Sequence, residues 1–234
     1  MRIRNIAAAC TCIAVLALGA CGNTSPSASD DTDRSYDHNT SKTMNTPSKK
    51  DRKGETMEAV VYFSRAGENY GVGTVRTGNT AKLAEAIAQA ADAPVIEITR
   101  DEPYPEGYDE TTAEAQQEQR TNTRPHITLK GDVDALDEAT TVHLGYPMWW
   151  GDAPMPVYTF LGGREWNGKT IYPFCTHEGS GLGGTPDNIA KAAHGAKIET
   201  GLAVRGTTAQ QDAGATRRAV DRWLSKQRRP AQTT

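Results

Sequence analysis

Cysteines are few in this sequence, and their positions exclude a domain held together by disulfides. Only four occur in 234 residues, and three of them, Cys10, Cys12 and Cys21, lie close to the N-terminus. Cys175 is the only cysteine in the rest of the chain. Because one thiol cannot form an internal disulfide, a hydrophobic core must stabilise the domain. Cys175 ends an apolar stretch, which favours a small core residue over a nucleophile.

The patterns typical of several functional classes are also missing. His126, His143, His177 and Cys175 lack the paired spacing of metal ligands, so we expect no metal site. No basic stripe with interleaved aromatic residues occurs, so we expect no nucleic-acid binding. Residues 178–182 read Glu-Gly-Ser-Gly-Leu and not Gly-x-Ser-x-Gly, so the sequence does not indicate a hydrolase triad.

Only one long hydrophobic run occurs, Ile6–Leu18, and it is too short to predict a membrane-spanning helix. Arg2 and Arg4 precede it, and small residues lead from it to Cys21, as in the lipobox of bacterial lipoproteins. We therefore predict a signal peptide over residues 1–20 and lipidation of Cys21. The protein would then act outside the cytoplasm, lipid-anchored to the bacterial cell membrane. An ordinary secretory signal and an uncleaved anchor are the alternatives.

Large aliphatic side chains are almost absent from residues 21–56, which are rich in Ser, Thr, Asn, Asp, Lys and Pro. Such a segment cannot bury enough apolar surface to offset its ordering entropy, so we predict a disordered tether that begins with the lipidated cysteine. A basic run at 49–53 suits contact with anionic lipid, but we expect a solvated tether. Residues 57–228 have the size of one domain, and 229–234 are predicted to be a flexible tail.

Strand and helix patterns alternate through this domain. Such alternation predicts parallel strands joined by right-handed crossovers, hence an α/β three-layer sandwich with five parallel strands in the order 2-1-3-4-5. Strands are predicted at Val60–Phe63, Pro94–Ile98, Thr141–Gly145, Lys169–Cys175 and within Ala196–Val204, and helices at Ala81–Ala91, Tyr108–Gln119, Pro156–Leu161, Pro186–Ala193 and Ala213–Lys226.

The crossing from the first strand to the first helix has the residues of a phosphate cradle. Gly78 permits a tight turn, and Asn79 or Thr80 can cap the helix. A helix N-terminus presents unpaired backbone N–H groups and partial positive charge, which favour a phosphate. Hydroxyls of Ser64, Thr77 and Thr80 would add donors. An ordinary polar turn is the alternative.

The loops after the third and fourth strands should meet this cradle at the carboxyl edge of the sheet. The first of them places Tyr146, Trp149 and Trp150 in a surface loop, where bare tryptophans are costly unless they pack inward or face a planar ligand. The second, residues 176–184, is rich in glycine, so its backbone can approach a ligand closely. A phosphorylated planar heterocycle fits these features; FMN fits best, and a nucleotide is the next candidate.

Several motifs, in this order, resemble the flavodoxin-like family, in particular its bacterial lipoproteins and FMN-dependent oxidoreductases. They are Tyr62–Arg65, Glu68–Tyr70, Gly78–Thr80, Tyr146–Gly151 and Pro173–Gly181. The resemblance covers the whole domain and implies a flavodoxin-like fold with FMN bound noncovalently.

The resemblance also implies a role for each motif. Ser64, Gly78, Asn79 and Thr80 would bind the phosphate, with Arg65 as a helper. The isoalloxazine ring would be lined by Pro147, Met148, Trp149, Trp150 and Gly151, with Trp149 stacking on it. The pyrimidine edge would contact Thr176, His177, Glu178, Gly179, Ser180 and Gly181.

This sequence departs from ordinary flavodoxins because Arg65–Thr77 separates Ser64 from Gly78. Either Ser64 or Thr77 is therefore the first phosphate donor. The inserted residues 68–70 either shape a substrate pocket over the flavin or brace the loop. Tyr70 and His177 are the candidate catalytic residues, with a simple loop hydrogen bond as the alternative role of His177.

Three functions follow, and the first is a reductase that passes electrons from NAD(P)H or a quinol to quinone-like or other small acceptors. The second is a one-electron carrier that docks a redox partner protein, although the formal net charge of −3, about −5 without Arg2 and Arg4, is modest for an acidic docking face. The third is a flavin-free scaffold lipoprotein. The sequence leaves the oligomeric state open.

Overall fold

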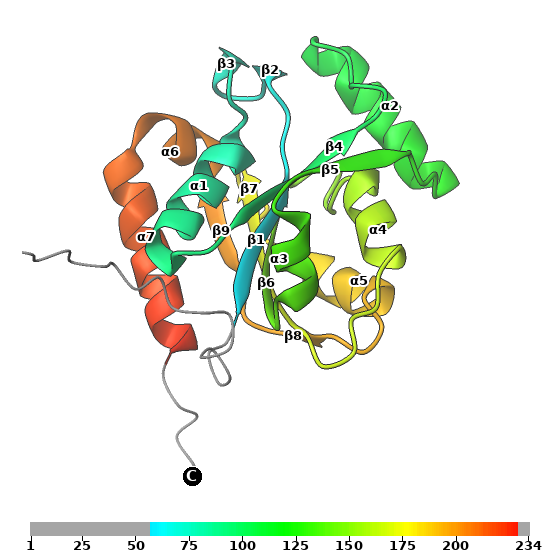
Figure 1. Cartoon of the computed structure of the whole chain (residues 1–234). Helices are drawn as coiled ribbons and strands as arrows, with labels where there is room; N and C mark the ends of the chain where they lie inside the picture. The colour runs from blue at the N-terminus through cyan, green and yellow to red at the C-terminus, as the bar shows by residue number, and fades with distance from the viewer. Residues whose placement is uncertain (1–56, 229–234) are drawn as a thin grey trace, which may run out of the picture. The chain divides into compact units, whose positions relative to one another are not determined.

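A seven-stranded sheet lies between two layers of helices in the structure, a computed structural model that describes residues 57–228 (Figure 1). The predicted signal peptide, Cys21, the tether and the C-terminal tail lie outside the described residues. None of the helices in the described part has the length and apolar character needed to cross a membrane.

The sheet has the strand order β5-β4-β1-β6-β7-β8, and β9 also pairs with β7. All pairings are parallel except that of β4 with the edge strand β5. The strands are β1 (Glu58–Phe63), β4 (Val95–Arg100), β5 (Ile127–Gly131), β6 (Thr141–Pro147), β7 (Thr170–His177), β8 (Lys197–Ile198) and β9 (Leu202–Arg205).

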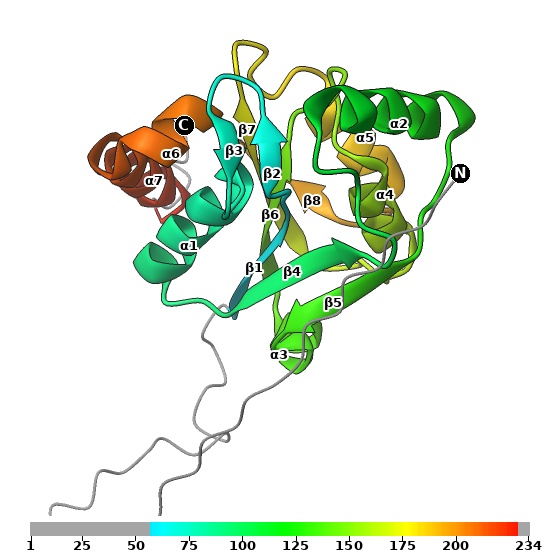
Figure 2. The ribbon, with the colours of Figure 1, turned by 90° about the horizontal axis from the view of Figure 1, so that it is seen from above.

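Helices cover both faces of this sheet (Figure 2). On one side lie α1 (Asn79–Ala91), α6 (Gly206–Gln211) and α7 (Ala213–Gln227), and on the other lie α2 (Tyr108–Thr121), α4 (Met155–Gly162) and α5 (Thr185–Ala192). The short helix α3 (Val133–Glu138) packs through Leu136 into the same core as α4 and α5. The predicted three-layer α/β architecture and the predicted helices are thus present.

The predicted five-stranded, all-parallel sheet is wrong, because the sheet has seven strands and its full order differs from 2-1-3-4-5. The strands that were predicted do lie in the expected relative order, β4-β1-β6-β7-β8. The segment Ile127–Gly131 forms an antiparallel edge strand that the sequence analysis missed, because its alternation of apolar and polar residues is short and it lies in a polar stretch. The predicted fifth strand is divided into β8 and β9. The break includes Gly201, where a Cβ would lie 2.6 Å from the carbonyl oxygen of Pro173, so the backbone approaches β7 too closely for a side chain.

A small hairpin outside the main sheet was also not predicted. Its strands are β2 (Gly67–Asn69) and β3 (Gly73–Val75), which pair only with each other. It occupies most of the insertion between Ser64 and Gly78. Helices α3 and α6, six residues each, were missed as well because so short a helix shows little periodicity.

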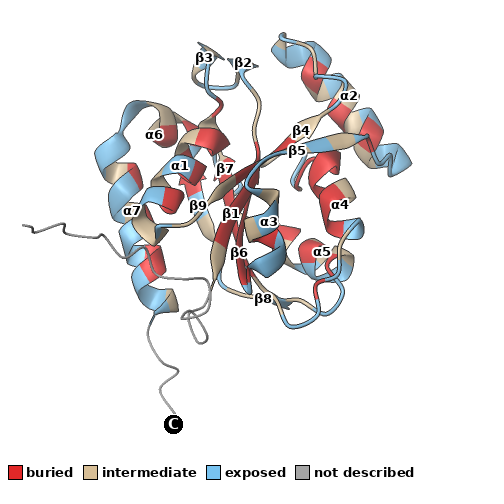
Figure 3. Cartoon of the chain, in the orientation of Figure 1, coloured by how far each residue is buried: buried red, intermediate tan, exposed pale blue. Residues whose placement is uncertain are grey.

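Strand β1 lies at the centre of both hydrophobic cores. Ala59, Val61 and Phe63 point into the core shared with α4 and α5, and Val60 and Tyr62 point into the core shared with α1 and α7. All five side chains are buried, and Figure 3 shows β1 and β6 as the most continuously buried strands. This explains why the β1 sequence is apolar without alternation, since neither face meets water.

The connection from β1 to α1 depends on a close approach of Gly78 to Ser64. The Ser64 Oγ accepts a hydrogen bond from the Ala81 N–H at 3.1 Å, so it takes the capping role predicted for Asn79 or Thr80. The N-cap position is Gly78, with φ of −65°, which any residue can adopt. Glycine is required there for another reason: a Cβ would lie 2.3 Å from the Ser64 Oγ and 2.4 Å from the Arg65 carbonyl oxygen.

A buried histidine holds the start of β1 at the opposite end of the sheet. The fully buried His143 on β6 donates from Nε2 to the Glu58 carboxylate at 2.8 Å. This hydrogen bond is the main cause that lowers the pKa of Glu58 from 4.5, and the positive charges of His143 and Arg228 add to it against the opposing effect of burial. Ionised Glu58 therefore stabilises the fold above pH 4.5, and this contribution is lost as the pH falls through the lower folded pKa.

We expect Gly78→Ala to lower the free energy of unfolding by about 2–3 kcal/mol, because the methyl group collides with backbone that cannot move without shifting β1 or α1. Urea unfolding of the purified protein measures this. Gly162→Ala is the matched control, since nothing lies within 4 Å of its Cβ position in α4; it should be neutral or slightly stabilising. Equal stability of the two variants would contradict the close approach.

We expect Glu58→Gln to lower the free energy of unfolding by about 1 kcal/mol at neutral pH, because the amide replaces a charged hydrogen-bond acceptor by a neutral one. The difference from wild type should shrink as the pH falls below about 4, where protonated Glu58 resembles the amide. Urea unfolding at neutral and acidic pH compares the two. A difference that does not change with pH would rule out the ionised carboxylate as its source.

Candidate functional site

A cavity of about 420 Å³ opens at the carboxyl ends of β1, β6 and β7. All three exposed large apolar side chains in the described part of the chain line this one cavity: Tyr70, Tyr108 and Trp150, with exposures of 65%, 36% and 54%. Such a gathering of solvent-facing aromatic rings is typical of a binding site for a flat apolar ligand. The other lining residues are Arg65, Asn69, Asn79, Thr111, Thr112, Ala115, Pro147, Met148, Trp149, Thr176, His177, Glu178 and Gly206.

A tight turn after β6 presents Trp150 to the cavity. Trp149 and Asp152 exchange backbone hydrogen bonds of 2.9 and 3.0 Å, and the two residues between them have positive φ, 50° for Trp150 and 79° for Gly151. This conformation is costly for a bulky residue and is typical of functional sites, where the surroundings hold it in place. Here the Trp150 indole N–H donates to the Thr112 carbonyl oxygen on α2 at 2.9 Å.

The Asp152 side chain fixes this turn to the neighbouring helices α4 and α5. Its carboxylate accepts hydrogen bonds from the Tyr158 hydroxyl at 2.6 Å and from the Asn188 side chain at 2.8 Å. The Met148 N–H donates to the Thr176 carbonyl oxygen at 2.8 Å, which joins the turn to β7. The aromatic loop is therefore held by α4, α5 and β7 together.

Trp149, predicted to stack on the ligand, also packs inward. Its ring meets those of Phe63 and Tyr104 edge-to-face, with centroid distances of 5.7 and 5.1 Å. It still lines the cavity, but it is partly buried whereas Trp150 is exposed. The stacking role of Trp149 stays a prediction, and Trp150 is a second candidate for that role.

The N-terminus of α1 provides an anion-binding end to the cavity. Asn79, in the first turn, lines the cavity, and its side-chain Oδ1 is buried without a hydrogen-bond partner among the described residues. The backbone N–H groups of Asn79 and Thr80 have no acceptor within the helix. Gly206 makes room for Asn79, since a Cβ there would lie 2.3 Å from the Asn79 Nδ2. The helix N-terminus has partial positive charge and free N–H donors, which favour an oxyanion. The buried Asn79 Oδ1 needs a donor, which a hydroxyl group of the ligand or a water molecule would supply.

The hydroxyls predicted to bind a phosphate do not line the cavity. Ser64 caps α1, and the exposed Thr77 accepts a hydrogen bond at its carbonyl oxygen from Gln210 at 2.7 Å. Thr80 is buried, and its hydroxyl shares a 2.8 Å hydrogen bond with that of Thr176. In this arrangement neither Ser64 nor Thr77 offers a hydroxyl to the cavity, and the backbone of the first turn is the main donor.

Arg65, predicted as a phosphate helper, lines the cavity and braces the hairpin beside it. Its guanidinium donates to the carbonyl oxygens of Glu68, Pro105, Glu106 and Gly107, at distances from 2.5 to 3.1 Å. Burial lowers the pKa of Arg65, against the opposing effect of two nearby carboxylates. With its donors occupied, the side chain ties the β2–β3 hairpin to the segment before α2.

The inserted residues 68–70 brace the loop and line the cavity, and their role in binding a substrate stays a prediction. Glu68 braces the loop, since its carboxylate accepts a hydrogen bond from the Tyr108 N–H at 3.1 Å. Asn69 and Tyr70 line the cavity, and the Tyr70 ring lies 6.1 Å from that of Tyr108. The hairpin and α2 therefore form a continuous cover on one side of the cavity.

Of the residues predicted to contact the pyrimidine edge, only those at the end of β7 and directly after it reach the cavity. Thr176, His177 and Glu178 line it, whereas Gly179, Ser180 and Gly181 do not. His177 Nδ1 accepts a hydrogen bond from the Gly179 N–H at 2.8 Å, which is the loop hydrogen bond considered above. Burial, and after it the positive charge of Arg205, lowers the pKa of His177, which favours the neutral ring.

Glu178 and Cys175 serve the same loop. The Glu178 carboxylate accepts from the Thr207 N–H at 2.7 Å and so joins the loop to α6. Cys175 is fully buried, its Sγ donates to the Gly181 carbonyl oxygen at 3.3 Å, and burial raises its pKa to about 12. The prediction of a core cysteine is confirmed.

Helix α2 is the part of the site that sequence reasoning missed. Its residues Thr111, Thr112 and Ala115 line the cavity, although the helix is polar and was predicted only as a connection. The available signal was the spacing of its buried residues, Thr111, Ala115 and Glu118, along one side of the helix.

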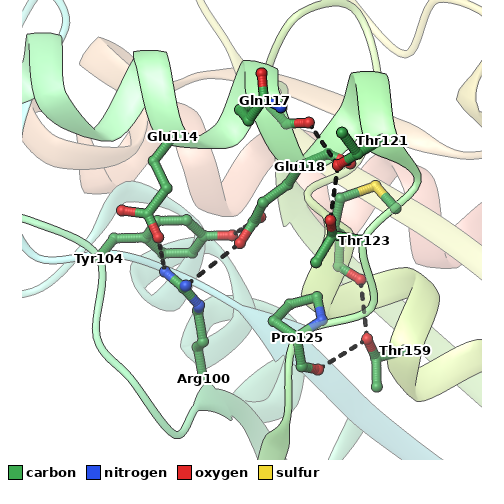
Figure 4. Close-up of polar contacts among 10 residues, drawn as sticks. Arg100, Tyr104, Glu114, Gln117, Glu118, Thr121, Thr123, Pro125 and Thr159 are labelled. Atoms are coloured by element: carbon green, nitrogen blue, oxygen red, sulfur yellow. Dashed lines mark hydrogen bonds and ion pairs between the residues drawn. The ribbon is translucent and has the colours of Figure 1, made fainter.

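A buried polar cluster attaches α2 to the end of β4 (Figure 4). Arg100 lies 2.5 Å from the Glu114 carboxylate and 3.5 Å from that of Glu118, and its guanidinium stands 4.4 Å above the Tyr104 ring. The Tyr104 hydroxyl donates to Glu118, and burial raises the pKa of Glu118. Since Tyr104 also contacts Trp149, the cluster positions α2 relative to the aromatic loop.

Comparison with known proteins agrees with this geometry. The sequence model of the flavodoxin family matches residues 70–226, and no curated protein sequence matches the chain. A protein from Bacteroides eggerthii assigned as a flavoprotein is 26% identical, with a TM-score of 0.58 over 74% of this chain and 98% of its own. One from Bacteroides uniformis with the same assignment is 25% identical, with a TM-score of 0.56 over 72% and 97%.

A third solved structure supports the fold. A flavoprotein from Lactobacillus acidophilus, in complex with FMN, is 21% identical, with a TM-score of 0.52 over 73% of this chain and 99% of its own. Because the family model covers most of the described domain, the chain belongs to the flavodoxin family.

Proposed function

We propose that this protein binds FMN in the 420 Å³ cavity and transfers electrons through it. The observation that carries the proposal is the gathering of Tyr70, Tyr108 and Trp150 around one cavity that ends at the N-terminus of α1. A planar ring system with a phosphate at the end of a short chain matches an aromatic enclosure joined to an anion-binding helix end. The FMN complex of the Lactobacillus acidophilus flavoprotein, which shares the fold, supports the same assignment.

The residues present fit this cofactor. The backbone N–H groups of Asn79 and Thr80 would hold the phosphate, and the buried Asn79 Oδ1 would accept from a hydroxyl of the ribityl chain. Pro147, Met148, Trp149 and Trp150 would line the ring system, with Thr176 and His177 on the far wall. Bound FMN supplies one- and two-electron redox chemistry, and the protein contributes binding, orientation and exclusion of water.

A reductase of quinone-like or other small acceptors is the function that the cover favours. The β2–β3 hairpin and α2, joined by Arg65 and Glu68, cover one side of the cavity, and a covered pocket suits a small planar substrate better than a docked protein. We further propose, from the predicted lipobox at Cys21, that this reaction takes place outside the cytoplasm at the membrane. A membrane quinol is then a more accessible donor than a nicotinamide.

A one-electron carrier is the second candidate, and the distribution of charge favours it. Between 101 and 118 the chain has seven acidic and no basic residues. Glu114 and Glu118 pair with Arg100, but the other five are exposed in the segment that leads into and begins α2, a helix that lines the cavity. They are Asp101, Glu102, Glu106, Asp109 and Glu110. A basic partner protein would be steered to such a rim.

The first test is a titration of the protein with FMN and with riboflavin. Tight binding of FMN and weaker binding of riboflavin are expected, because riboflavin lacks the phosphate for the α1 N-terminus. We expect Trp150→Ala to weaken FMN binding by about 1–3 kcal/mol through lost stacking, and Trp150→Phe, which keeps a ring, to lose less. Absence of FMN binding by the wild type would leave the flavin-free scaffold as the better description.

Two measurements distinguish a reductase from a carrier: a redox titration of the FMN-loaded protein, and electron-transfer rates after the five exposed acidic residues are neutralised. Two resolved one-electron potentials indicate a carrier, and a single two-electron potential with quinone turnover indicates a reductase. For a carrier, changing the five exposed acids to their amides should slow reduction of the basic protein cytochrome c at least about fivefold at low salt. A small neutral quinone is the control acceptor, and its rate should not change.

A further inference from the structure

The outer face of α7 is strongly basic in a domain that is otherwise acidic. Residues 217–228 contain five basic side chains and one acidic, a net charge of +4, whereas residues 57–216 contain 12 basic and 22 acidic, a net charge of −10. The basic residues are Arg217, Arg218, Arg222, Lys226 and Arg228, and all five are exposed. Charge is therefore separated across the molecule.

The fold places these side chains on one surface. Thr216, Val220, Trp223 and Leu224 are the buried residues of α7 and face the core shared with α1. Arg218, Arg222 and Lys226 are exposed and spaced by four residues, so they form one row on the solvent side of the helix. Figure 3 shows both buried and exposed stretches along α7.

No ion pair neutralises this row. Within the described part of the chain, none of the five basic residues lies within 4.0 Å of a carboxylate oxygen. Three carboxylates lie nearby, Asp221 within α7, Asp212 at its start and Glu58 beside Arg228, so the surface keeps a net positive charge. An unneutralised basic surface on an acidic domain favours contact with an extended anionic surface.

The basic face lies next to the point where the preceding chain enters the domain. Glu58, at the start of β1, borders the same small hollow as Leu224, Gln227 and Arg228 at the end of α7. The chain from the predicted lipidation site at Cys21 thus joins the domain beside the basic face. The 36 residues from Cys21 to Met57 reach at most about 130 Å when extended, so the linkage alone does not orient the domain.

We propose that the outer face of α7 docks the domain on an anionic membrane surface. The cavity lies at the carboxyl ends of the strands, and β1 begins beside the end of α7, so the docked domain keeps its cavity open to partners. The acidic residues 101–110, which lead into and begin the cavity-lining helix α2, would be repelled by the same membrane, which favours this orientation. The inference rests on the proposed membrane location and is independent of the proposed chemistry.

The test is sedimentation with lipid vesicles, using the chain from residue 21 onward with Cys21→Ser so that no acyl chain contributes. Both cores lie within residues 57–228, so removal of 1–20 leaves the folded domain intact. The vesicles contain equal parts of phosphatidylglycerol and phosphatidylcholine, or phosphatidylcholine alone, in about 0.1 M salt, where the screening length is about 10 Å. Binding to the anionic vesicles alone is expected.

The variant R218E/R222E/K226E should lower the partition coefficient at least about tenfold, because three attractive charges become repulsive. The control R124E/K130E/K191E changes the net charge by the same amount at exposed positions outside α7. It should lower the partition coefficient less than about twofold. The glutamine variants of Arg218, Arg222 and Lys226 repeat the comparison without new carboxylates. Thermal unfolding and FMN titration of the α7 variants should match the wild type, since Arg218, Arg222 and Lys226 are exposed and do not line the cavity.

Three outcomes would overturn the proposal. The first is absence of wild-type binding to anionic vesicles. The second is that both charge-reversal variants lower the partition coefficient equally, which would assign binding to net charge, or that the α7 variant does not lower it at all, which would assign binding to the basic run at 49–53. The third is tighter binding of a single-stranded RNA than of vesicles at the same salt, which would assign the face to nucleic acid. None of them affects the FMN assignment, which the titration tests separately.

Discussion

The close approach of Gly78 to Ser64 is the constraint on which the rest of the site depends. It brings the first turn of α1 against the end of β1, so that the Ser64 hydroxyl caps the helix and the helix N-terminus opens at the carboxyl edge of the sheet. Residues 65–77 then have to leave the sheet and return to it. They form the β2–β3 hairpin, which places Asn69 and Tyr70 over the cavity. One steric contact thus positions both the anion-binding end and part of the cover.

The walls of the cavity come from segments far apart in the sequence, and polar contacts between these segments fix their relative positions. Arg65 joins the hairpin to the segment before α2, and the cluster of Arg100, Glu114 and Glu118 joins α2 to β4. The Trp150 indole then rests on the backbone of α2. The aromatic rings stay exposed because the side chains beneath them are fixed, which preorganises the site for a flat ligand.

Charge divides the domain in a way that its modest net value conceals. Acidic residues gather before and along α2, which lines the cavity, and basic residues gather on α7, whose end lies beside the entry of the preceding chain. With this distribution, basic partners are attracted to one face of the domain and an anionic surface to another. The proposed chemistry and the proposed docking use different faces of the same fold.

The sequence by itself determined the α/β class, the five longer helices, the buried Cys175 and the three loops that meet at the site, because each depends on local periodicity and composition. Tertiary structure alone decided the edge strand β5, the division of β8 from β9, and the part that α2 plays in the cavity. It also decided that Arg65 donates hydrogen bonds to backbone carbonyl oxygens, that the Ser64 hydroxyl caps α1 and that the hydroxyls of Thr80 and Thr176 pair with each other. A side chain's type shows what it can bind, but its partner depends on which distant segment the fold brings within hydrogen-bonding distance.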